Sequence, residues 1–328
     1  MGYSKNWKES WTKKDAINYL FSQAKIRSKK SGKSEAFIIC DALFCLFVYQ
    51  ATFHDYMNLR YYIHNRNERN SFLTTLMVAR EKKTWPHHLV DLVDNKMSFN
   101  SFFKEYISRE WIDGDTVTNN NFISFCKRHN SIVIKPKRES SGVGIEKIDI
   151  NPTTDYNKIY QDLQGKIVEE SISCCEELKK LNPHSMTQIR VVTVTNNDKV
   201  HILAATLRTG GNIAVGYNTA KDDIFSQINI ETGICFTNGV NESGDELVKH
   251  PVSQIVFVGY KIPRWEELKQ ICVDAALMVK EVRVIGWDVT ITDNGITFFE
   301  GNPGSGVASM QIADGIGKRD LFYQYLYN

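Results

Sequence analysis

Two short strand-like segments near the C-terminal end, separated by a tight turn, constrain this chain more than any other feature. Residues 286–303 are typical of a β-hairpin whose turn is Asp293-Asn294-Gly295. If these three residues form the loop, the pairing places Asp288 directly opposite Glu300. Asn302 lies two residues beyond Glu300, so the strand period puts it on the same face. The hairpin is therefore predicted to gather two carboxylates and an amide oxygen.

This acidic group has two interpretations. Like charges that face each other destabilise a hairpin, so a cation is expected between the two carboxylates. Ligands that are all oxygen suit a Mg²⁺ ion that phosphates also hold. The alternative is an acidic pair on an edge hairpin that faces solvent and binds nothing.

The composition of the chain sets the outer limits. Its 328 residues are enough for two domains, or for one large domain with subdomains. The hydrophobic fraction of 42% and the charged fraction of 24% are those of a soluble globular protein. The net charge of +2 gives no reason to expect a nucleic-acid partner. Residues 1–11 contain no apolar core segment, so no signal peptide is expected.

The cysteines favour a reducing compartment. Seven are scattered along the chain without a C-x-x-C pair, which disfavours a zinc site or a disulfide framework. Reduced cysteines in a cytoplasmic protein are the simplest account.

The first fifty residues predict two helices of different character. Residues 1–33 are basic, and Asp15 to Lys30 is predicted to be a helix with a solvated charged face. The alternatives are contact with an anionic membrane surface or with an acidic partner. Ser34 to Ala51 is strongly apolar but contains Asp41 and is shorter than the roughly 20 residues of a membrane span. It is predicted to be a buried helix, with a helix lying on the membrane as the alternative.

The predicted secondary structure changes from helices to strands at Ser131. A strand to Lys135 is followed by a loop with the segment Ser140-Ser141-Gly142-Val143-Gly144, and then by a strand to Ile150. The backbone N–H groups of such a loop can surround phosphate oxygens. The spacing matches neither a P-loop nor a dinucleotide fingerprint, so an ordinary hairpin tip is the alternative.

Two arginines stand in later strands. Arg190 and Arg208 belong to the predicted hairpin of residues 188–195 and 199–209. A buried arginine there needs an anionic partner, whereas alternation also allows either side chain to be exposed.

The order of these parts resembles the ATP-grasp superfamily. Val168-Glu169-Glu170-Ser171-Ile172 looks like the hinge strand that meets the adenine. Ile285-Gly286-Trp287-Asp288 and Glu300-Gly301-Asn302-Pro303 look like the metal-binding strands. The resemblance implies an α+β fold, with ATP between the antiparallel sheets of two α+β subdomains, preceded by a mainly helical N-terminal region.

The resemblance is closer to the sugar-transfer-associated branch of that superfamily and covers the chain from about residue 34 to its end. It implies a helical region at residues 1–93, a nucleotide-lid subdomain at 94–172 and a metal- and substrate-binding subdomain at 173–328. Where the branch is expected to have Asp-Asn and then Gly-Gly, this chain has Tyr217-Asn218 and Asp222-Asp223, which affects the substrate-side loop most. The stretches that carry the resemblance are His54-Asp55-Tyr56, Asn67-Glu68-Arg69, Asn95-Lys96, Ser108-Arg109-Glu110-Trp111, Ile189-Arg190-Val191-Val192-Thr193, Leu207-Arg208, His250-Pro251, Ile262-Pro263-Arg264-Trp265 and Gly286-Trp287-Asp288-Val289.

The same resemblance implies roles for individual residues around ATP. Lys96 and Lys135 would hold the α- and β-phosphates, and the 140–144 loop would close over them. Glu169, Glu170 and Ile172 lie where the hinge meets the adenine. Either Glu176 or Glu177 would take the ribose hydroxyls.

The metal and the reacting groups are assigned in the same way. Asp288, Glu300 and Asn302 would bind one or two Mg²⁺ ions, for which Mn²⁺ is the expected substitute. Arg190 and Arg208, together with Lys135, are the catalytic candidates. The two guanidinium groups would hold the substrate carboxylate, the transferred phosphoryl group or the tetrahedral oxyanion.

The implied activity is that of a carboxylate–amine ligase that proceeds through an acyl phosphate. Its partners would be a small-molecule or sugar-linked carboxylate and an amine or amino acid, in surface-polysaccharide or sugar-conjugate biosynthesis. A kinase on the same fold and a catalytically inactive nucleotide-binding module are the alternatives. The intact set of Asp288, Glu300 and Asn302 argues against the inactive module.

Overall fold

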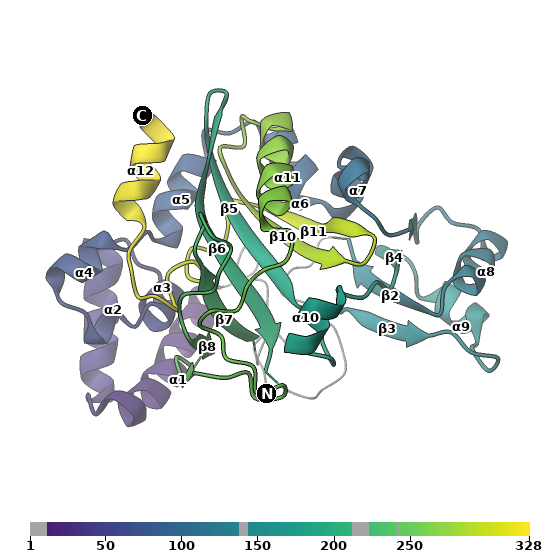
Figure 1. The fold of residues 1–328 in the computed structure, drawn as a ribbon. Coiled ribbons are helices and arrows are strands. Elements are labelled where there is room, and N and C mark those ends of the chain that lie inside the picture. The colour runs from purple at the N-terminus through teal and green to yellow at the C-terminus, as the bar shows by residue number, and fades with distance from the viewer. Residues whose placement is uncertain (1–11, 138–143, 212–222, 242) are drawn as a thin grey trace.

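A large antiparallel sheet forms the centre of the molecule (Figure 1). The computed structural model describes residues 12–137, 144–211, 223–241 and 243–328. Within these ranges the large sheet has seven strands in the order β11-β10-β5-β6-β7-β8-β9. Their bounds are β5 (Gln188–Asn196), β6 (Lys199–Gly210), β7 (Asp223–Ile228), β8 (Gly239–Asn241), β9 (Glu246–Leu247), β10 (Val284–Thr292) and β11 (Gly295–Pro303).

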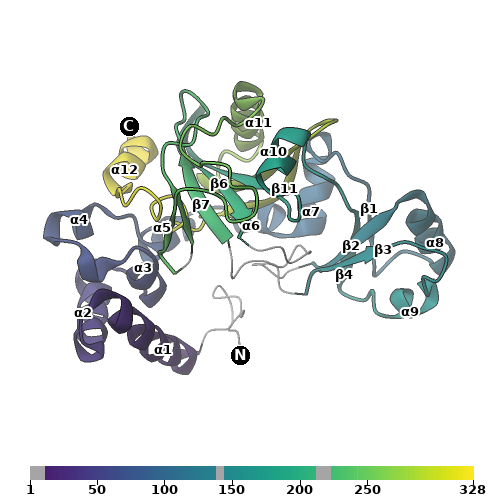
Figure 2. The ribbon, with the colours of Figure 1, turned by 60° about the horizontal axis from the view of Figure 1, so that its bottom comes forward.

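A smaller antiparallel sheet lies to one side of the large sheet (Figures 1 and 2). We call it the lid sheet, after the nucleotide-lid subdomain predicted for residues 94–172. Its order in the described residues is β1-β4-β2-β3, and α8 and α9 cover it. Phe122 and Phe125 of α8 pack with Ile132, Ile134 and Val168 in a core of its own. The bounds are β1 (Trp111–Asp113), α8 (Asn119–Arg128), β2 (Ser131–Pro136), β3 (Glu146–Asp149), α9 (Tyr156–Gln161) and β4 (Lys166–Glu170).

The predicted helical N-terminal region is confirmed, but it belongs to two hydrophobic cores. Residues between Leu20 and Phe72 form one cluster among themselves. Residues from Leu73 to Phe103 pack into the core of the large sheet instead, so the clusters do not follow the predicted boundary at residue 93. The helices are α1 (Lys13–Ser31), α2 (Glu35–Val48), α3 (Phe53–Asn58), η1 (Tyr61–Ile63), α4 (Arg66–Ser71), α5 (Thr75–Lys82), α6 (His87–Asp94), α7 (Lys96–Phe102) and η2 (Lys104–Tyr106).

The prediction of a buried helix for residues 34–51 is wrong for half of its surface. Helix α2 begins after Ser34, whose side chain accepts a hydrogen bond from the Phe37 amide. Ile38 and Ala42 are buried against α1, because they share one stripe of the helix. The opposite stripe is exposed, and the side chain of Phe47 is 81% accessible.

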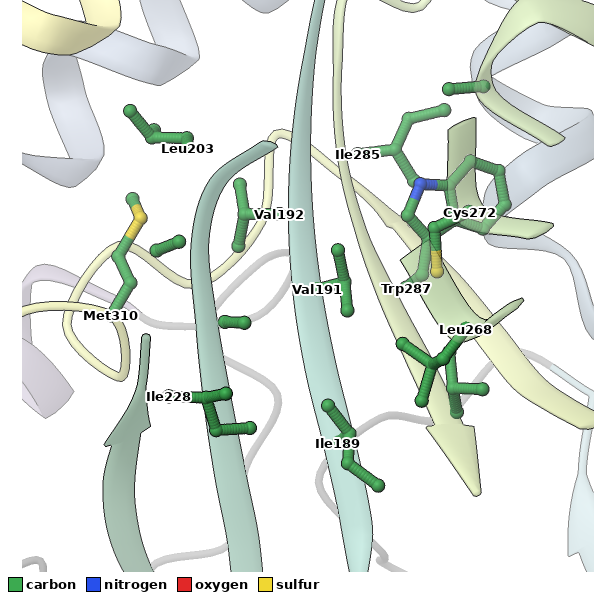
Figure 3. Packing of buried hydrophobic residues seen from close by; sticks show 14 of the residues in the cluster. Ile189, Val191, Val192, Leu203, Ile228, Leu268, Cys272, Ile285, Trp287 and Met310 are labelled. Carbon is green, nitrogen blue, oxygen red and sulfur yellow. The ribbon is translucent and has the colours of Figure 1, made fainter. Parts of the chain in front are cut away.

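The two faces of the large sheet carry different side chains. Ile189, Val191 and Trp287 point towards Leu268 and Cys272 of α11 (Trp265–Met278), as Figure 3 shows. Because strand side chains alternate, the neighbouring Arg190 and Asp288 point to the other face. Helices α10 (Glu176–Leu181) and α12 (Arg319–Tyr327) complete the molecule.

The C-terminal hairpin reaches the predicted pairing by a different route. Thr292 pairs with Gly295, so the loop has two residues rather than the predicted three. That loop alone would set Phe299 opposite Asp288, but a bulge at Phe299 shifts the register. Asp288 therefore pairs with Glu300 as predicted, and both side chains lie on one face.

Two further findings concern compartment and membrane. All seven cysteines lie in the described residues and carry free thiols. Among the described helices, none has the length and hydropathy needed to cross a bilayer.

Candidate active site

Three neighbouring strands bring a row of charged side chains together on the face away from α11. Arg190 of β5 pairs with Asp288 of β10, and Asp288 pairs with Glu300 of β11. The Arg190 Nε atom donates to Asp288 Oδ1 over 2.6 Å, and its Nη2 atom donates to Oδ2 over 2.5 Å. Asn302 Nδ2 lies 3.3 Å from Glu300 Oε1 and 3.4 Å from Asp288 Oδ2. The three predicted metal ligands are thus brought within contact of one another.

The side-chain donors fit a magnesium ion that is bound by protein oxygens and by phosphate oxygens together. In the described part of the chain no three His, Cys, Asp or Glu side chains group around one point. Asp288 and Glu300 supply carboxylates, and a half-turn of the Asn302 amide would present its oxygen in place of its nitrogen. Mg²⁺ is commonly bound by one or two carboxylates plus substrate phosphates, with several waters retained. The metal assignment itself stays a prediction.

Buried cations surround Glu300. Burial raises the pKa of this carboxyl, but Lys96, Arg190 and Lys135 outweigh burial and lower it to about 2. Lys96 and Lys135 are themselves only 8% and 6% exposed. The family resemblance implies that these two lysines hold phosphates, and in the structure both act electrostatically on Glu300, one of the metal-ligand candidates.

Gly301 allows the helix that carries Lys96 to pack closely against strand β11. Lys96 is the first residue of α7, and Asn95 caps this helix by accepting from the amides of Met97 and Ser98. A Cβ on Gly301 of β11 would stand 2.6 Å from Val93 and 3.0 Å from Phe99. Only glycine therefore permits this close approach of α6 and α7 to the hairpin.

Glu169 binds Lys135 of the lid sheet and fixes its position. Its carboxylate accepts from Lys135 Nζ at 2.7 Å, from Arg109 Nε at 2.8 Å and from Asn100 Nδ2 at 3.0 Å. Arg109 also donates to the carbonyl of Phe298 at 2.5 Å, so it joins the lid strand β4 to the hairpin strand β11. Burial lowers the pKa of Lys135 to about 8, against the opposing effect of Glu169. The pKa of Glu169 is held far below its usual range, because Arg109 and Lys135 overcome the effect of its burial.

The side chains of the two hinge glutamates are engaged within the protein, and their predicted place beside the adenine stays a prediction. Strand β4 lies between β1 and β2, so the Glu169 backbone is paired within the sheet. The Glu169 side chain binds Arg109 and Lys135. Glu170 points to the opposite face, where its carboxylate accepts from the Glu110 amide at 3.1 Å. Arg109 was missed as a site residue, although it lies in one of the stretches that carried the resemblance.

The second arginine has a carboxylate partner that the prediction missed. Arg208 Nη2 lies 2.5 Å from Asp223 Oδ2, and its Nε atom donates to the same oxygen at 2.6 Å. Asp223 is buried, and burial raises its pKa. Both arginine side chains are partly buried, at 16% and 28% exposure, and each is paired with a buried carboxylate. Asp223 belongs to the Asp222-Asp223 pair, which departs from the family pattern. This departure was the one sequence feature that could have drawn attention to Asp223.

A cavity of about 140 Å³ opens beside the residues that follow β4. Ile172 lines it, together with Cys174, whose sulfur lies 3.4 Å from Thr290 Oγ1. Thr290 is two residues from Asp288 and on the same face of β10. The cavity is smaller than the roughly 300–1,000 Å³ of complete ligand sites. The complete lining is Lys147, Ile172, Ser173, Cys174, Lys179, Asn182, Pro183, His184, Ser185 and Met186.

The remaining predicted contacts stay predictions. Glu176 pairs with Lys179 at 2.8 Å, and neither Glu176 nor Glu177 lines the cavity. Ser140, Ser141, Gly142 and Val143 lie outside the described residues, as do Tyr217, Asn218 and Asp222. Gly144 is described and has a φ of 71°, in the left-handed region that glycine tolerates.

Comparisons with known proteins place this site in a family. A family model described as sugar-transfer associated ATP-grasp matches residues 79–324. No curated protein matches the chain. Among solved structures, ATP-grasp ligase PsnB, complexed with a phosphomimetic variant of a minimal precursor, Mg and ADP, is 12% identical with a TM-score of 0.44. That match covers 79% of this chain and 68% of PsnB.

Two other solved structures are similar at the same level. D-alanyl-alanine synthetase A from Vibrio cholerae O1 biovar eltor str. N16961 is 11% identical, with a TM-score of 0.44 and coverage of 72% of this chain and 66% of that one. An L-amino acid ligase from Bacillus licheniformis is 11% identical, with a TM-score of 0.45. That match covers 74% of this chain and 50% of the ligase.

Proposed function

The chain belongs to the sugar-transfer associated ATP-grasp family, and we propose that it is an ATP-dependent ligase that joins a carboxylate to an amine. The row Arg190–Asp288–Glu300, with Lys96 and Lys135 beside it, carries the proposal. Buried carboxylates and cations in one place can hold a metal ion and several phosphate oxygens together.

The first step would transfer a phosphoryl group. A substrate carboxylate oxygen attacks the γ-phosphorus of ATP, the bond from that phosphorus to the β-phosphate oxygen breaks, and ADP leaves. Lys96 and Lys135 bind phosphate oxygens as point charges, and Glu169 holds Lys135 in place. When bound at Asp288, Glu300 and Asn302, Mg²⁺ supplies charge that neutralises the developing charge on the phosphates.

The second step would form the amide. The amine nitrogen attacks the acyl carbon, the bond from carbon to the phosphate oxygen breaks, inorganic phosphate leaves and the nitrogen loses a proton. Arg190 and Arg208 stand on the same sheet face, where a guanidinium group can bind the acyl carboxylate or the tetrahedral oxyanion bidentately. Their carboxylate partners Asp288 and Asp223 hold both groups in fixed orientations.

The substrate class is proposed from the family alone. The family description points to sugar transfer, which supports a sugar-linked carboxylate and an amine or amino acid in surface-polysaccharide or sugar-conjugate assembly. PsnB is described with a precursor peptide, and the Bacillus licheniformis protein as an L-amino acid ligase, so related folds accept peptides and amino acids as well.

A hydroxylamine trap tests the reaction. The chain is incubated with Mg-ATP, hydroxylamine and a panel of uronic acids, sugar-linked carboxylates and amino acids. Release of ADP together with a hydroxamate supports the acyl phosphate, because hydroxylamine intercepts it in place of the amine. ADP release with a stable phosphorylated product contradicts the ligase and identifies a kinase. A chain that fails to bind Mg-ADP in calorimetry contradicts both readings.

A further inference from the structure

Helix α2 carries an apolar face that the fold leaves exposed. Phe37, Phe44 and Phe47 are spaced as i, i+7 and i+10, which places them on one side of the helix. Phe47 is the most accessible of them, at 81%. We name this set the α2 face; its members are Phe37, Cys40, Leu43, Phe44, Phe47 and Val48, all exposed.

Folding does not account for this face. The opposite side of α2 already supplies its share of the N-terminal core through Ile38, Ala42 and Cys45. Asp41, the charged residue in the middle of the helix, is held by Arg69, whose Nη1 and Nη2 atoms donate to it at 2.8 Å. A contiguous exposed apolar patch on a folded protein typically marks an interaction site.

Lys33 borders the α2 face, and the neighbouring helix α1 exposes further basic side chains. The Lys33 Nζ atom stands 4.7 Å from the centre of the Phe37 ring. Helix α1 packs against α2 and exposes Lys14 and Lys25 on the same stripe as the exposed Phe21, at spacings of seven and four residues. Residues 12–48 contain seven Lys or Arg and three Asp or Glu, whereas the whole chain has an excess of only two positive charges.

We propose that the α1–α2 hairpin docks on an anionic lipid surface, with the α2 face lying in the membrane interface. Apolar side chains of an amphipathic helix enter the boundary of the acyl chains, and bordering lysines bind anionic headgroups. With 14 residues, α2 is roughly 21 Å long, which suits a helix lying in the interface rather than one crossing the bilayer. A second copy of the chain would bring the same excess of positive charge to the contact, so charge complementarity favours lipid. The proposal does not depend on the ligase chemistry.

Vesicle binding of the full chain tests this directly. The chain should float with vesicles of phosphatidylglycerol and phosphatidylcholine and remain unbound with vesicles of phosphatidylcholine alone. Replacing Phe44 and Phe47 by serine should lower the partition coefficient by about tenfold or more, because each phenyl ring loses its place in the interface. Phe236→Ser removes an exposed aromatic ring, 47% accessible, that lies between β7 and β8 and outside the α2 face, and it should leave binding unchanged.

The single variant Phe47→Ser guards against misfolding, because its ring is almost free of packing. It should melt at the wild-type temperature and still bind vesicles several-fold more weakly. Lys25→Glu should lower binding by about fivefold or more, and the loss should shrink as salt is added.

A label on Cys40 reports insertion. It is the one exposed cysteine of the seven, and it lies within the α2 face, four residues before Phe44. An environment-sensitive fluorophore on Cys40 should shift to shorter wavelength only with vesicles that contain phosphatidylglycerol. Equal binding to both vesicle types, an unchanged spectrum, or a dimer in sedimentation without vesicle binding would each overturn the proposal.

Discussion

The two faces of strands β5 and β10 share one backbone and differ in almost everything else. Towards α11, Val191 and Trp287 pair in a core without charges. On the other face Arg190 and Asp288 pair one residue away, and Asn302, Glu300 and Arg208 add polar and charged groups around this pair. The apolar face holds the fold together, whereas the charged face gathers buried ions whose cost is offset only by their mutual pairing.

Stability and chemistry are separated here by the width of one sheet. A substitution on one face should therefore alter mainly the free energy of unfolding, and a substitution on the other mainly nucleotide binding and turnover.

Glu300→Gln should have the largest effect. The change removes a carboxylate from the proposed metal site and leaves Lys96, Arg190 and Lys135 without their shared anion. ATP turnover should fall by about 10³-fold or more, since the stabilisation of phosphate charge depends on this site. Circular dichroism should show a wild-type fold, and Glu246→Gln on the edge strand β9 is the matched control. Turnover near the wild-type level would remove Glu300 from the metal site.

Trp287→Ala tests the apolar face. Trp287 is fully buried, and its Nε1 atom donates to Thr193 Oγ1 at 2.9 Å. The free energy of unfolding in urea should fall by about 3–5 kcal/mol, as for other large aromatic truncations. Trp287→Phe should lose less stability and keep the wild-type affinity for Mg-ADP. A Trp287→Phe protein that is stable but unable to bind Mg-ADP would show that the two faces are not separate.

Lys135→Ala tests the lid side of the site. Loss of the ammonium group should raise the dissociation constant for ATP by about 100-fold, close to 2.7 kcal/mol. Calorimetric titration measures this change, and Lys166→Ala, on the neighbouring strand β4 with an exposed partner Asp162, is the matched control. Unchanged affinity in Lys135→Ala would exclude a phosphate contact.

The pH dependence of binding should be the smallest effect. Burial lowers the pKa of Lys135 from its ordinary value of 10.5 to about 8, so above that pH the free protein loses the charge. Phosphate oxygens would raise this pKa again, so ATP binding near pH 8.5 should take up protons, and affinity should fall as pH rises. Calorimetry in buffers of different ionisation enthalpy measures the uptake, which should disappear in Lys135→Ala.

The same shift has an opposite consequence for folding. Between pH 8 and 10.5 the unfolded chain binds more protons at Lys135 than the folded chain does, so this lysine makes the protein more stable as pH rises. A pH series of urea unfolding on wild type and Lys135→Ala checks the sign.

Short-range patterns predicted much of the fold. The hairpin of β5 and β6, the strand β2 and the helix α1 lie where the sequence pattern predicted them. Helix α2 shows the limit of such reasoning, because an apolar run indicates a helix but does not say whether another element covers both of its sides.

The candidate site divides in the same way. Glu300 and Asn302 could be predicted to share a face, since the strand period is a local property. Their alignment with Asp288 and Arg190 depends on the bulge at Phe299 and on the pairing of β5 with β10. The roles of Arg109 and Asp223 could not be predicted, because the partner of each side chain depends on how distant strands pack.

The sequence by itself determined which residues alternate across each strand and the order in which lysines, arginines and carboxylates occur. The tertiary structure decided which of them meet. The hairpin is the clearest case: a two-residue turn would have sent Glu300 to the apolar face, and the bulge at Phe299 returns it to Asp288. Arg109 binds the Phe298 carbonyl beside this bulge and also binds Glu169 of β4. The pairing register of β10 and β11, which the local sequence pattern left open, is therefore found together with contacts between residues far apart in the sequence.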